Sequence, residues 1–141
     1  YCKQIVKNAQ TIAETLLNLD YDIVSGGTDT HLVLIDLTNK GISGKKAEIT
    51  LEKAGITTNK NMVPFDDKSP MITSGIRIGT PAMTTRGLKE NEMVEIARLM
   101  DNVIQNIQDE KVIKDTRESV SELCTTFPIY KESVINEVPQ L

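Results

Sequence analysis

The chain has 141 residues, of which 39% are hydrophobic and 26% charged, and its formal net charge is -4. This size and balance predict one globular domain over residues 1–141. The acidic balance excludes a basic nucleic-acid surface, and no apolar run approaches the roughly 20 residues of a membrane span. Cys2 and Cys124 are too few and too far apart in the sequence for a disulfide framework or a metal site. We therefore expect reduced thiols and a cytoplasmic location.

The first predicted element is a long amphipathic helix. Its apolar residues recur at three- and four-residue steps, and they are Cys2, Ile5, Val6, Ala9, Ile12, Ala13, Leu16 and Leu17. Asn18 and Asp20 are expected to end it. Because this helical pattern begins at Tyr1 without a capping residue, we expect the chain to be a piece of a longer protein.

A hairpin is predicted next. Residues 21–25 alternate as in a short strand, and residues 26–30 have the glycine-rich chemistry of a turn. The run HLVLIDL at 31–37 is so apolar that we expect a strand covered on both faces, or nearly so. Two strands joined by a short turn favour antiparallel pairing.

A second helix follows, with Ser43 as its N-cap and Gly55 at its C-terminal cap. Residues 56–58 are expected to form a brief strand. Residues 59–70 contain two prolines and two adjacent aspartates, which predicts a loop. Such a loop is a common place for binding residues.

A strand around Arg77 is the most informative part of the sequence. With a two-residue period, one face of it is buried and apolar, while the other carries Arg77 between Gly75 and Gly79. Glycine in a strand often marks the close approach of a ligand or of another backbone. An arginine on a rigid strand can bind a carboxylate or phosphate through two parallel hydrogen bonds. We interpret Arg77 as an anion receptor; the alternative is an arginine in a structural ion pair or in solvent.

The last third of the chain is mainly helical. Residues 82–87 are expected to form an irregular crossing that carries Arg86, followed by helices with apolar stripes over 93–107 and 112–127. Pro128 should stop the last helix, and residues 132–141 are expected to be a loose tail. The whole order predicts an α+β layer sandwich, with a small, mainly antiparallel sheet and helices mostly on one face.

No self-contained active site emerges from these residues. His31 opens a strand, where a structural role is the more common one, and Asp66 with Asp67 suits turn chemistry better than paired acid–base work. What remains is a set of binding groups: Arg77, Arg86 and the NKN segment at 59–61. An asparagine amide can donate to and accept from a flat heterocycle at once. The residues thus predict a small-molecule binding module that completes an active site formed elsewhere.

Several motifs in this sequence resemble the small domain of the serine hydroxymethyltransferase family. They are VSGGTD at 24–29 with HLVL at 31–34, NKN at 59–61, SGIRIGTPA at 74–82 and TTRG at 84–87. The SGIR-x-GTPA run is specific, and the similarity covers most of the chain. Thr30 and Met71 depart from the residues more usual in the family, asparagine and an aromatic.

The resemblance implies a function for the protein from which the chain derives. The chain would be the C-terminal small domain of a fold-type I pyridoxal-phosphate (PLP) enzyme. That enzyme interconverts serine plus tetrahydrofolate with glycine plus 5,10-methylenetetrahydrofolate, a reaction of one-carbon metabolism and glycine biosynthesis. By this resemblance Arg77 binds the substrate carboxylate, Asn61 contacts the folate, and residues 59–69 line the folate cleft. Arg86 and His31 match family positions but are expected to be structural.

The resemblance also places the cofactor chemistry outside this chain. The Schiff-base lysine, the aspartate facing the pyridinium nitrogen and the phosphate-binding loop belong to the family's large domain, and none of their motifs occurs here. We therefore expect no catalytic, cofactor-binding or metal-binding residue in this fragment, which alone should be inactive. PLP, the missing large domain and a homodimer or tetramer belong to the full-length parent.

Two other functions fit the same residues. The chain could be a stand-alone regulatory module that senses an amino acid, although no second anchoring group for an α-amino nitrogen is evident. It could also be a structural or interaction domain in which Arg77 forms a salt bridge.

Overall fold

The centre of the structure is a four-stranded sheet with the order β1-β2-β4-β3, in which every neighbouring pair is antiparallel. This computed structural model describes residues 1–129, so the expected tail at 132–141 lies outside the described residues. The elements are α1 (Cys2–Asn18), β1 (Asp22–Ile23), β2 (Leu32–Asp36), α2 (Gly44–Lys53), β3 (Asn59–Asn61), β4 (Gly75–Gly79), α3 (Pro81–Thr85), α4 (Glu90–Gln105) and α5 (Glu110–Thr126).

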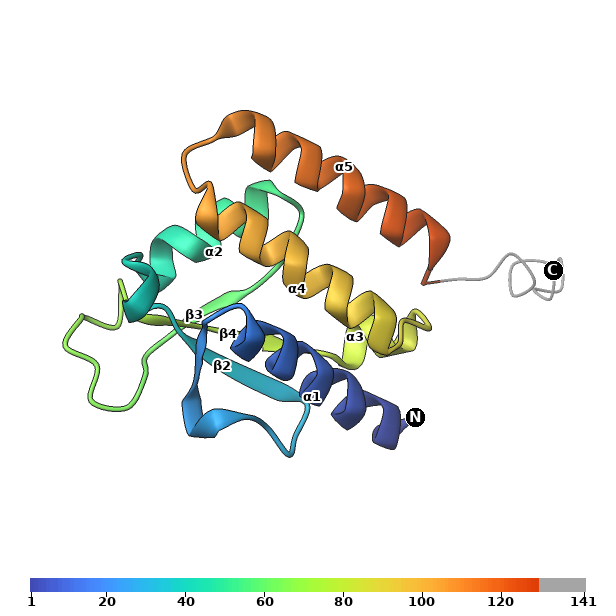
Figure 1. Cartoon of the computed structure of the whole chain (residues 1–141), viewed down its shortest axis with the longest axis horizontal. Helices are drawn as coiled ribbons and strands as arrows, with labels where there is room; N and C mark the ends of the chain where they lie inside the picture. Colours follow the sequence, from blue (N-terminus) through green and yellow to red (C-terminus); the bar gives the residue numbers. More distant parts are fainter. Residues whose placement is uncertain (130–141) are drawn as a thin grey trace, which may run out of the picture.

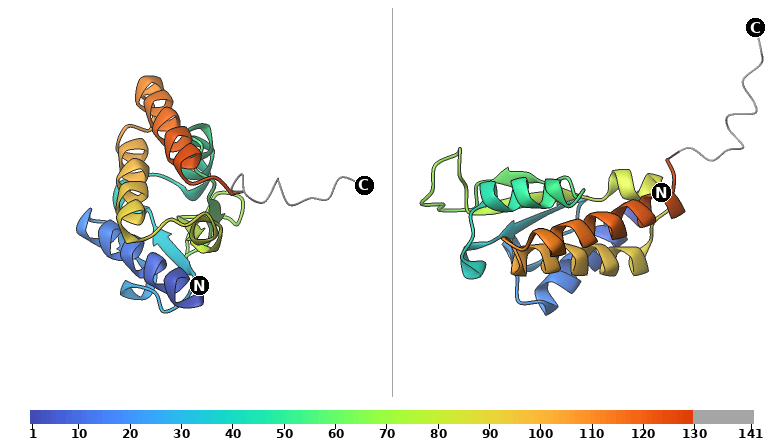
Figure 2. Two further views of the ribbon diagram at one scale, coloured as in Figure 1. Left: turned by 90° about the vertical axis from the view of Figure 1, so that its right-hand side faces the viewer. Right: turned by 90° about the horizontal axis from the view of Figure 1, so that it is seen from above.

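The helices α1, α2 and α4 pack on one face of this sheet, and α5 lies outside them against α4 and α2 (Figures 1 and 2). No helix of residues 1–129 lies over the other face of the sheet. The predicted α+β sandwich with a small antiparallel sheet is therefore confirmed. No helix in the described part of the chain is long and apolar enough to cross a membrane.

The core forms where the apolar stripes of the helices meet the inward face of the sheet. Its fully buried large side chains come from α1, β2, α2, β4 and α4, and they include Leu16, Ile35, Leu51, Ile76, Met93 and Met100. The stripes that the sequence predicts for the first, second and third long helices are therefore the buried ones. Ser43 caps α2 as expected, because its hydroxyl accepts from the Lys46 N–H at 3.1 Å.

Polar contacts fix α1 against α3 and α4. The buried Asn8 amide donates to the Thr84 hydroxyl at 2.9 Å and to the Leu88 carbonyl at 3.0 Å. The preceding residue, Lys7, forms an ion pair with Glu90 at 2.6 Å. The Lys7 ammonium, the backbone at the start of α4 and the Gln4 amide lower the pKa of Glu90 from 4.5 to about 2. The first helix is thus positioned by hydrogen bonding as well as by its apolar stripe.

Strand β2 differs from its prediction in one respect. Its side chains alternate between buried and half-buried, with Val33 and Ile35 inward and Leu32 and Leu34 outward. The expectation of cover on both faces, or nearly so, is wrong, because the chain places its helices on one side of the sheet. The predicted antiparallel hairpin is confirmed by the pairing of Asp22 with Asp36.

Two segment assignments are also wrong. Residues 56–58 are not a strand; the strand β3 is Asn59–Asn61, inside the stretch expected to be a loop. This polar segment has no apolar alternation, and it is a strand because it pairs with β4 along the sheet edge. Residues 82–87 are mostly helical rather than irregular, since Pro81 occupies the first turn of α3.

The start of β4 is held tightly by the first turn of α2. The Gly44 and Lys45 N–H groups, which a helix leaves unpaired at its start, donate to the Thr73 and Ile72 carbonyls at 3.1 and 2.9 Å. Such close contact requires a glycine. A Cβ atom on Gly44 would lie 2.1 Å from both the Gly75 carbonyl oxygen and the Thr73 hydroxyl.

We expect Gly44→Ala to destabilise the fold by about 1–3 kcal/mol or more, because the clash is partly with backbone that no rotamer change can relieve. Urea unfolding measures this. Gly27→Ala is the matched control: nothing lies within 4 Å of its added Cβ, so its cost should stay within about 0.5 kcal/mol. Equal unfolding midpoints for the two variants would show that α2 does not approach β4 this closely.

Candidate functional site

Arg77 lies in the middle of the sheet, on the strand β4 that has a neighbour on each side. It stands opposite Leu34 on β2 and Asn59 on β3, and its side chain is exposed on the face without helices. Within residues 1–129, no ion pair or side-chain hydrogen bond involves Arg77. The described part of the chain therefore leaves its guanidinium available to an external anion.

Asn61 shares this face with Arg77. It stands opposite Gly75, two residues from Arg77 along β4, so the two side chains are diagonal neighbours at about 7–8 Å. The Asn61 side-chain amide donates to the Met62 carbonyl at 2.8 Å. This bond uses one of its two N–H groups, and the amide oxygen remains available as an acceptor. The structure thus brings the two sequence-predicted binding residues together, although their segments are separated by the loop between β3 and β4.

The glycines on either side of Arg77 are explained by neighbouring protein atoms rather than by space for a ligand. A Cβ on Gly75 would meet the Ile35 carbonyl oxygen and Val63 Cγ1 at 2.7 Å, and the Asn61 carbonyl oxygen at 3.0 Å. One on Gly79 would meet Leu32 Cδ2 at 3.2 Å. A glycine in a strand can mark the close approach of a ligand or of another part of the protein, and the second explanation applies here.

Sequence reasoning missed the β2 side of this face. Asp36 lies opposite Gly75 and is therefore a neighbour of Arg77 on the same face. Its Oδ1 accepts from the Thr38 N–H at 2.9 Å and from the Thr38 hydroxyl at 2.6 Å. This carboxylate is thus tied to the turn after β2 rather than to Arg77. The two-residue period of β2 places Asp36 on the same face as Arg77. The interpretation of β2 as buried on both faces hid this signal.

Asp66 organises the loop between β3 and β4. Its carboxylate accepts from the Lys68 and Ser74 N–H groups at 2.9 and 2.8 Å, from the Ser74 hydroxyl at 2.7 Å, and from the Val63 N–H at 3.2 Å. Partial desolvation raises the pKa of Asp66, but these hydrogen bonds outweigh it and hold the pKa well below its usual range. The predicted turn chemistry of Asp66 is therefore confirmed, and it fixes the loop at the entrance to β4.

This loop carries exposed apolar side chains beside the open face. Met62, Phe65 and Met71 are 41%, 105% and 69% exposed. Phe65 also has a positive φ of 58°, a conformation that a bulky residue adopts only when its surroundings impose it. The Asp66 N–H donates to the Val63 carbonyl at 3.0 Å and closes a turn that contains Phe65. The loop that carries these exposed side chains projects from one end of the sheet (Figure 1).

The other residues singled out in the sequence lie elsewhere. Arg86 follows α3, and its Nη1 donates to the Phe127 and Cys124 carbonyls at 3.0 and 3.4 Å, at the end of α5. His31 is exposed before β2, where its carbonyl accepts from the Thr80 N–H at 3.2 Å. Neither joins Arg77 and Asn61. Cys2 and Cys124 are free thiols.

The placement of the lysines bears on whether the described residues could hold PLP. A cofactor of this kind needs a lysine for its aldehyde, and no lysine lies on the strand positions of the Arg77 face. Lys60 on β3 has the opposite orientation and pairs with Glu48 at 3.9 Å, while Lys68 donates to the Ser74 hydroxyl at 3.1 Å. At its described strand positions the face thus presents the Arg77 guanidinium and the Asn61 amide, and no lysine amine.

Fold and site together define a small α+β domain that presents an unpaired arginine and an asparagine on an open sheet face. A sequence model of the family described as serine hydroxymethyltransferase matches residues 1–100 of this chain. The chain belongs to the serine hydroxymethyltransferase family, a family of transferases that depend in general on PLP and folate. The match includes every strand and ends within α4, so α5 lies outside it.

We expect Asp66→Asn to loosen the loop, because an amide nitrogen cannot accept the hydrogen bonds that the carboxylate oxygens accept. Amide hydrogen exchange at Val63 and Ser74 should quicken by roughly tenfold or more. Asp67→Asn, at the exposed neighbouring position, is the control and should change neither rate.

The same measurement has an expected pH dependence. Since the pKa of Asp66 is depressed in the folded state, its contribution to stability is complete above the ordinary aspartate pKa and is lost as pH falls through the lower, folded value. Protection at Ser74 should therefore be constant from about pH 5 to pH 8 after correction for intrinsic exchange. Loss of protection within that range would contradict the role of Asp66.

Proposed function

We propose that this chain is the C-terminal small domain of a serine hydroxymethyltransferase that interconverts serine plus tetrahydrofolate with glycine plus 5,10-methylenetetrahydrofolate. In this role Arg77 binds the carboxylate of serine or glycine. The observation that carries the proposal is the unpaired guanidinium on the open face of a central strand. Arginine provides a planar fork that matches a carboxylate in two parallel hydrogen bonds.

The folate part of the proposal rests on Asn61 and the loop after it. The Asn61 amide oxygen and its second N–H can bind a heterocycle that has both donors and acceptors at its edge. The loop that follows Asn61 exposes the apolar side chains of Met62, Phe65 and Met71. A flat pteridine has the same combination of polar edge and apolar face.

The remaining machinery belongs to the rest of the enzyme. A large domain would face the open side of the sheet and supply the lysine, the aspartate and the phosphate-binding loop for PLP, in a homodimer or tetramer. An open face with half-buried Leu32 and Leu34 supports such a partner, because apolar strand residues are usually covered in the assembled protein. The cytoplasmic location stays a prediction from the two cysteines.

The deciding experiment is Arg77→Ala in the full-length enzyme. Loss of a charged bidentate contact, about 1.5–3 kcal/mol, should raise KM for serine tenfold or more. Thermal unfolding should be unchanged, because the Arg77 side chain is exposed and forms no ion pair or side-chain hydrogen bond with the described residues. Arg98→Ala, at an exposed position on α4, is the control and should leave both measurements unchanged. A loss of stability with KM for serine unchanged would instead support the structural-domain hypothesis.

The separated chain should not bind the cofactor. We expect the purified 141-residue protein, mixed with PLP and desalted, to retain no protein-bound absorbance band in the visible range. It should likewise not turn over serine with tetrahydrofolate. A retained yellow absorbance that survives the desalting step would show that the chain contains a cofactor site of its own.

A further inference from the structure

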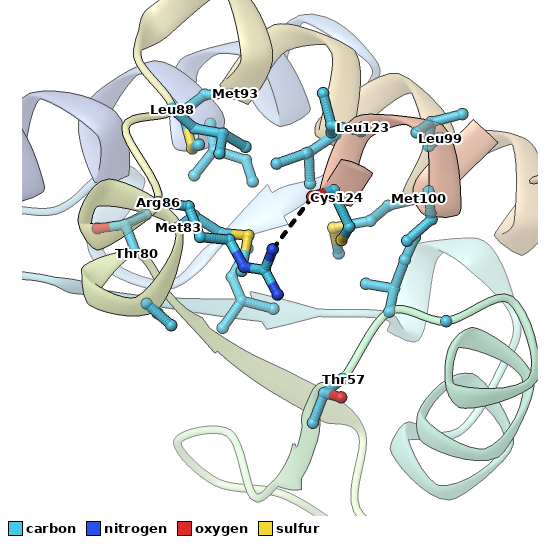
Figure 3. A pocket seen from close by; sticks show the side chains of 18 residues that line it. Thr57, Thr80, Met83, Arg86, Leu88, Met93, Leu99, Met100, Leu123 and Cys124 are labelled. Atoms are coloured by element: carbon cyan, nitrogen blue, oxygen red, sulfur yellow. Dashed lines mark hydrogen bonds between the residues drawn. The ribbon is translucent and has the colours of Figure 1, made fainter. Parts of the chain in front are cut away.

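A cavity of about 480 Å³ lies between α4, α5, α3 and the end of β4 (Figure 3). Its walls are mostly apolar, and they include Met83, Met93, Ile96, Leu99, Met100 and Leu123. Protein interiors are normally close-packed, and voids larger than a water molecule are few. The volume is within the roughly 300–1,000 Å³ that small-molecule sites occupy.

One charged side chain enters this cavity. The Arg86 guanidinium lies between Met83 and Cys124, with its second terminal nitrogen directed away from α5 toward the side where Thr57 lies (Figure 3). Nη1 is used by the Cys124 and Phe127 carbonyls, as described above. Within residues 1–129 the Nε and Nη2 donors have no protein acceptor within hydrogen-bonding distance. An arginine has five N–H donors, so three of them remain for a ligand.

The outer wall of the cavity is α5, which contributes Val120, Leu123 and Cys124. This helix has few buried residues: of its 17 residues, only Ile113 and Thr116 are buried. Polar contacts near its middle, from Arg117 to the Lys53 carbonyl at 2.9 Å, and at its C-terminal end, from Arg86, help hold it to the body of the domain. The helix is therefore anchored at these two places, while Val120, Leu123 and Cys124 line the cavity.

We propose that this cavity binds an amphipathic monocarboxylate, a molecule with one carboxylate and an apolar tail. The carboxylate binds the Nε and Nη2 groups of Arg86, and the tail fills the space between Leu99 and Leu123. A neutral apolar molecule would leave those donors unpaired in a largely apolar setting, which costs free energy. A highly charged anion such as a nucleotide would place charges against the apolar walls, which is still more costly. The site is separate from Arg77 and does not depend on the proposed reaction.

The test compares dodecanoate with dodecanol in the complete 141-residue chain, using a Cys2→Ser variant so that Cys124 is the single thiol. Calorimetry should show dodecanoate binding at least tenfold more tightly than dodecanol. Dodecanoate should also slow alkylation of Cys124 by iodoacetamide at least tenfold at saturation, because the thiol lines the cavity.

Two variants locate the ligand. Arg86→Leu should remove the preference for dodecanoate over dodecanol, whereas Arg98→Leu, on an exposed part of α4, should keep it. Because Arg86 also binds the end of α5, a second variant leaves it in place: Leu99→Trp should fill the cavity and abolish binding of both probes. Equal affinity for the two probes in the unmodified chain, or dodecanoate binding without protection of Cys124, would overturn the proposal.

Discussion

The close contact between the first turn of α2 and the start of β4 is the constraint on which the geometry of the site depends. Gly44 has no side chain, so the helix can donate two of its otherwise unpaired N–H groups directly to the carbonyls of residues 72 and 73. From the other side, the Leu37 N–H donates to the Ser74 carbonyl at 2.9 Å, and Asp66 binds the Ser74 amide and hydroxyl. Thr73 is turned to a φ of 60° by these contacts, and β4 begins only at Gly75.

This arrangement determines where Arg77 points. Side chains along a strand alternate between its faces, so a shift of one residue at the start of β4 would place Arg77 in the core and Ile76 in solvent. The surroundings of Gly75 prevent such a shift, because its carbonyl neighbours on β2 and β3 leave no room for any side chain. The glycines beside the arginine therefore set the register of the strand that carries it. They fix the position of Arg77 through that register, and the space beside them is filled by neighbouring protein atoms.

Sequence reasoning succeeded where a segment has its own periodicity and failed where the sheet alone determines the structure. The apolar stripes of α1, α2 and α4 and the alternation around Arg77 are local signals, and the structure agrees with them. Asn59–Asn61 has no such signal: its three polar residues form a strand only because β4 offers an edge. The exposed face of β2 was misjudged for a related reason, since Leu32 and Leu34 are apolar residues on a face that no helix in the described part of the chain covers.

The two arginines singled out in the sequence have opposite environments, and this contrast separates their roles. Arg86 donates to the last carbonyls of α5, where the negative end of the helix dipole favours a cation. Arg77 has no such partner in the described residues, and its only neighbouring carboxylate, Asp36, is bonded to Thr38. Residue type and the match to the family do not distinguish the two, because both occur in the matched range. Only the fold does so: it packs one half-buried guanidinium against a helix end and an apolar cavity, and it leaves the other on the open face of the sheet, where a substrate and a second domain can reach it.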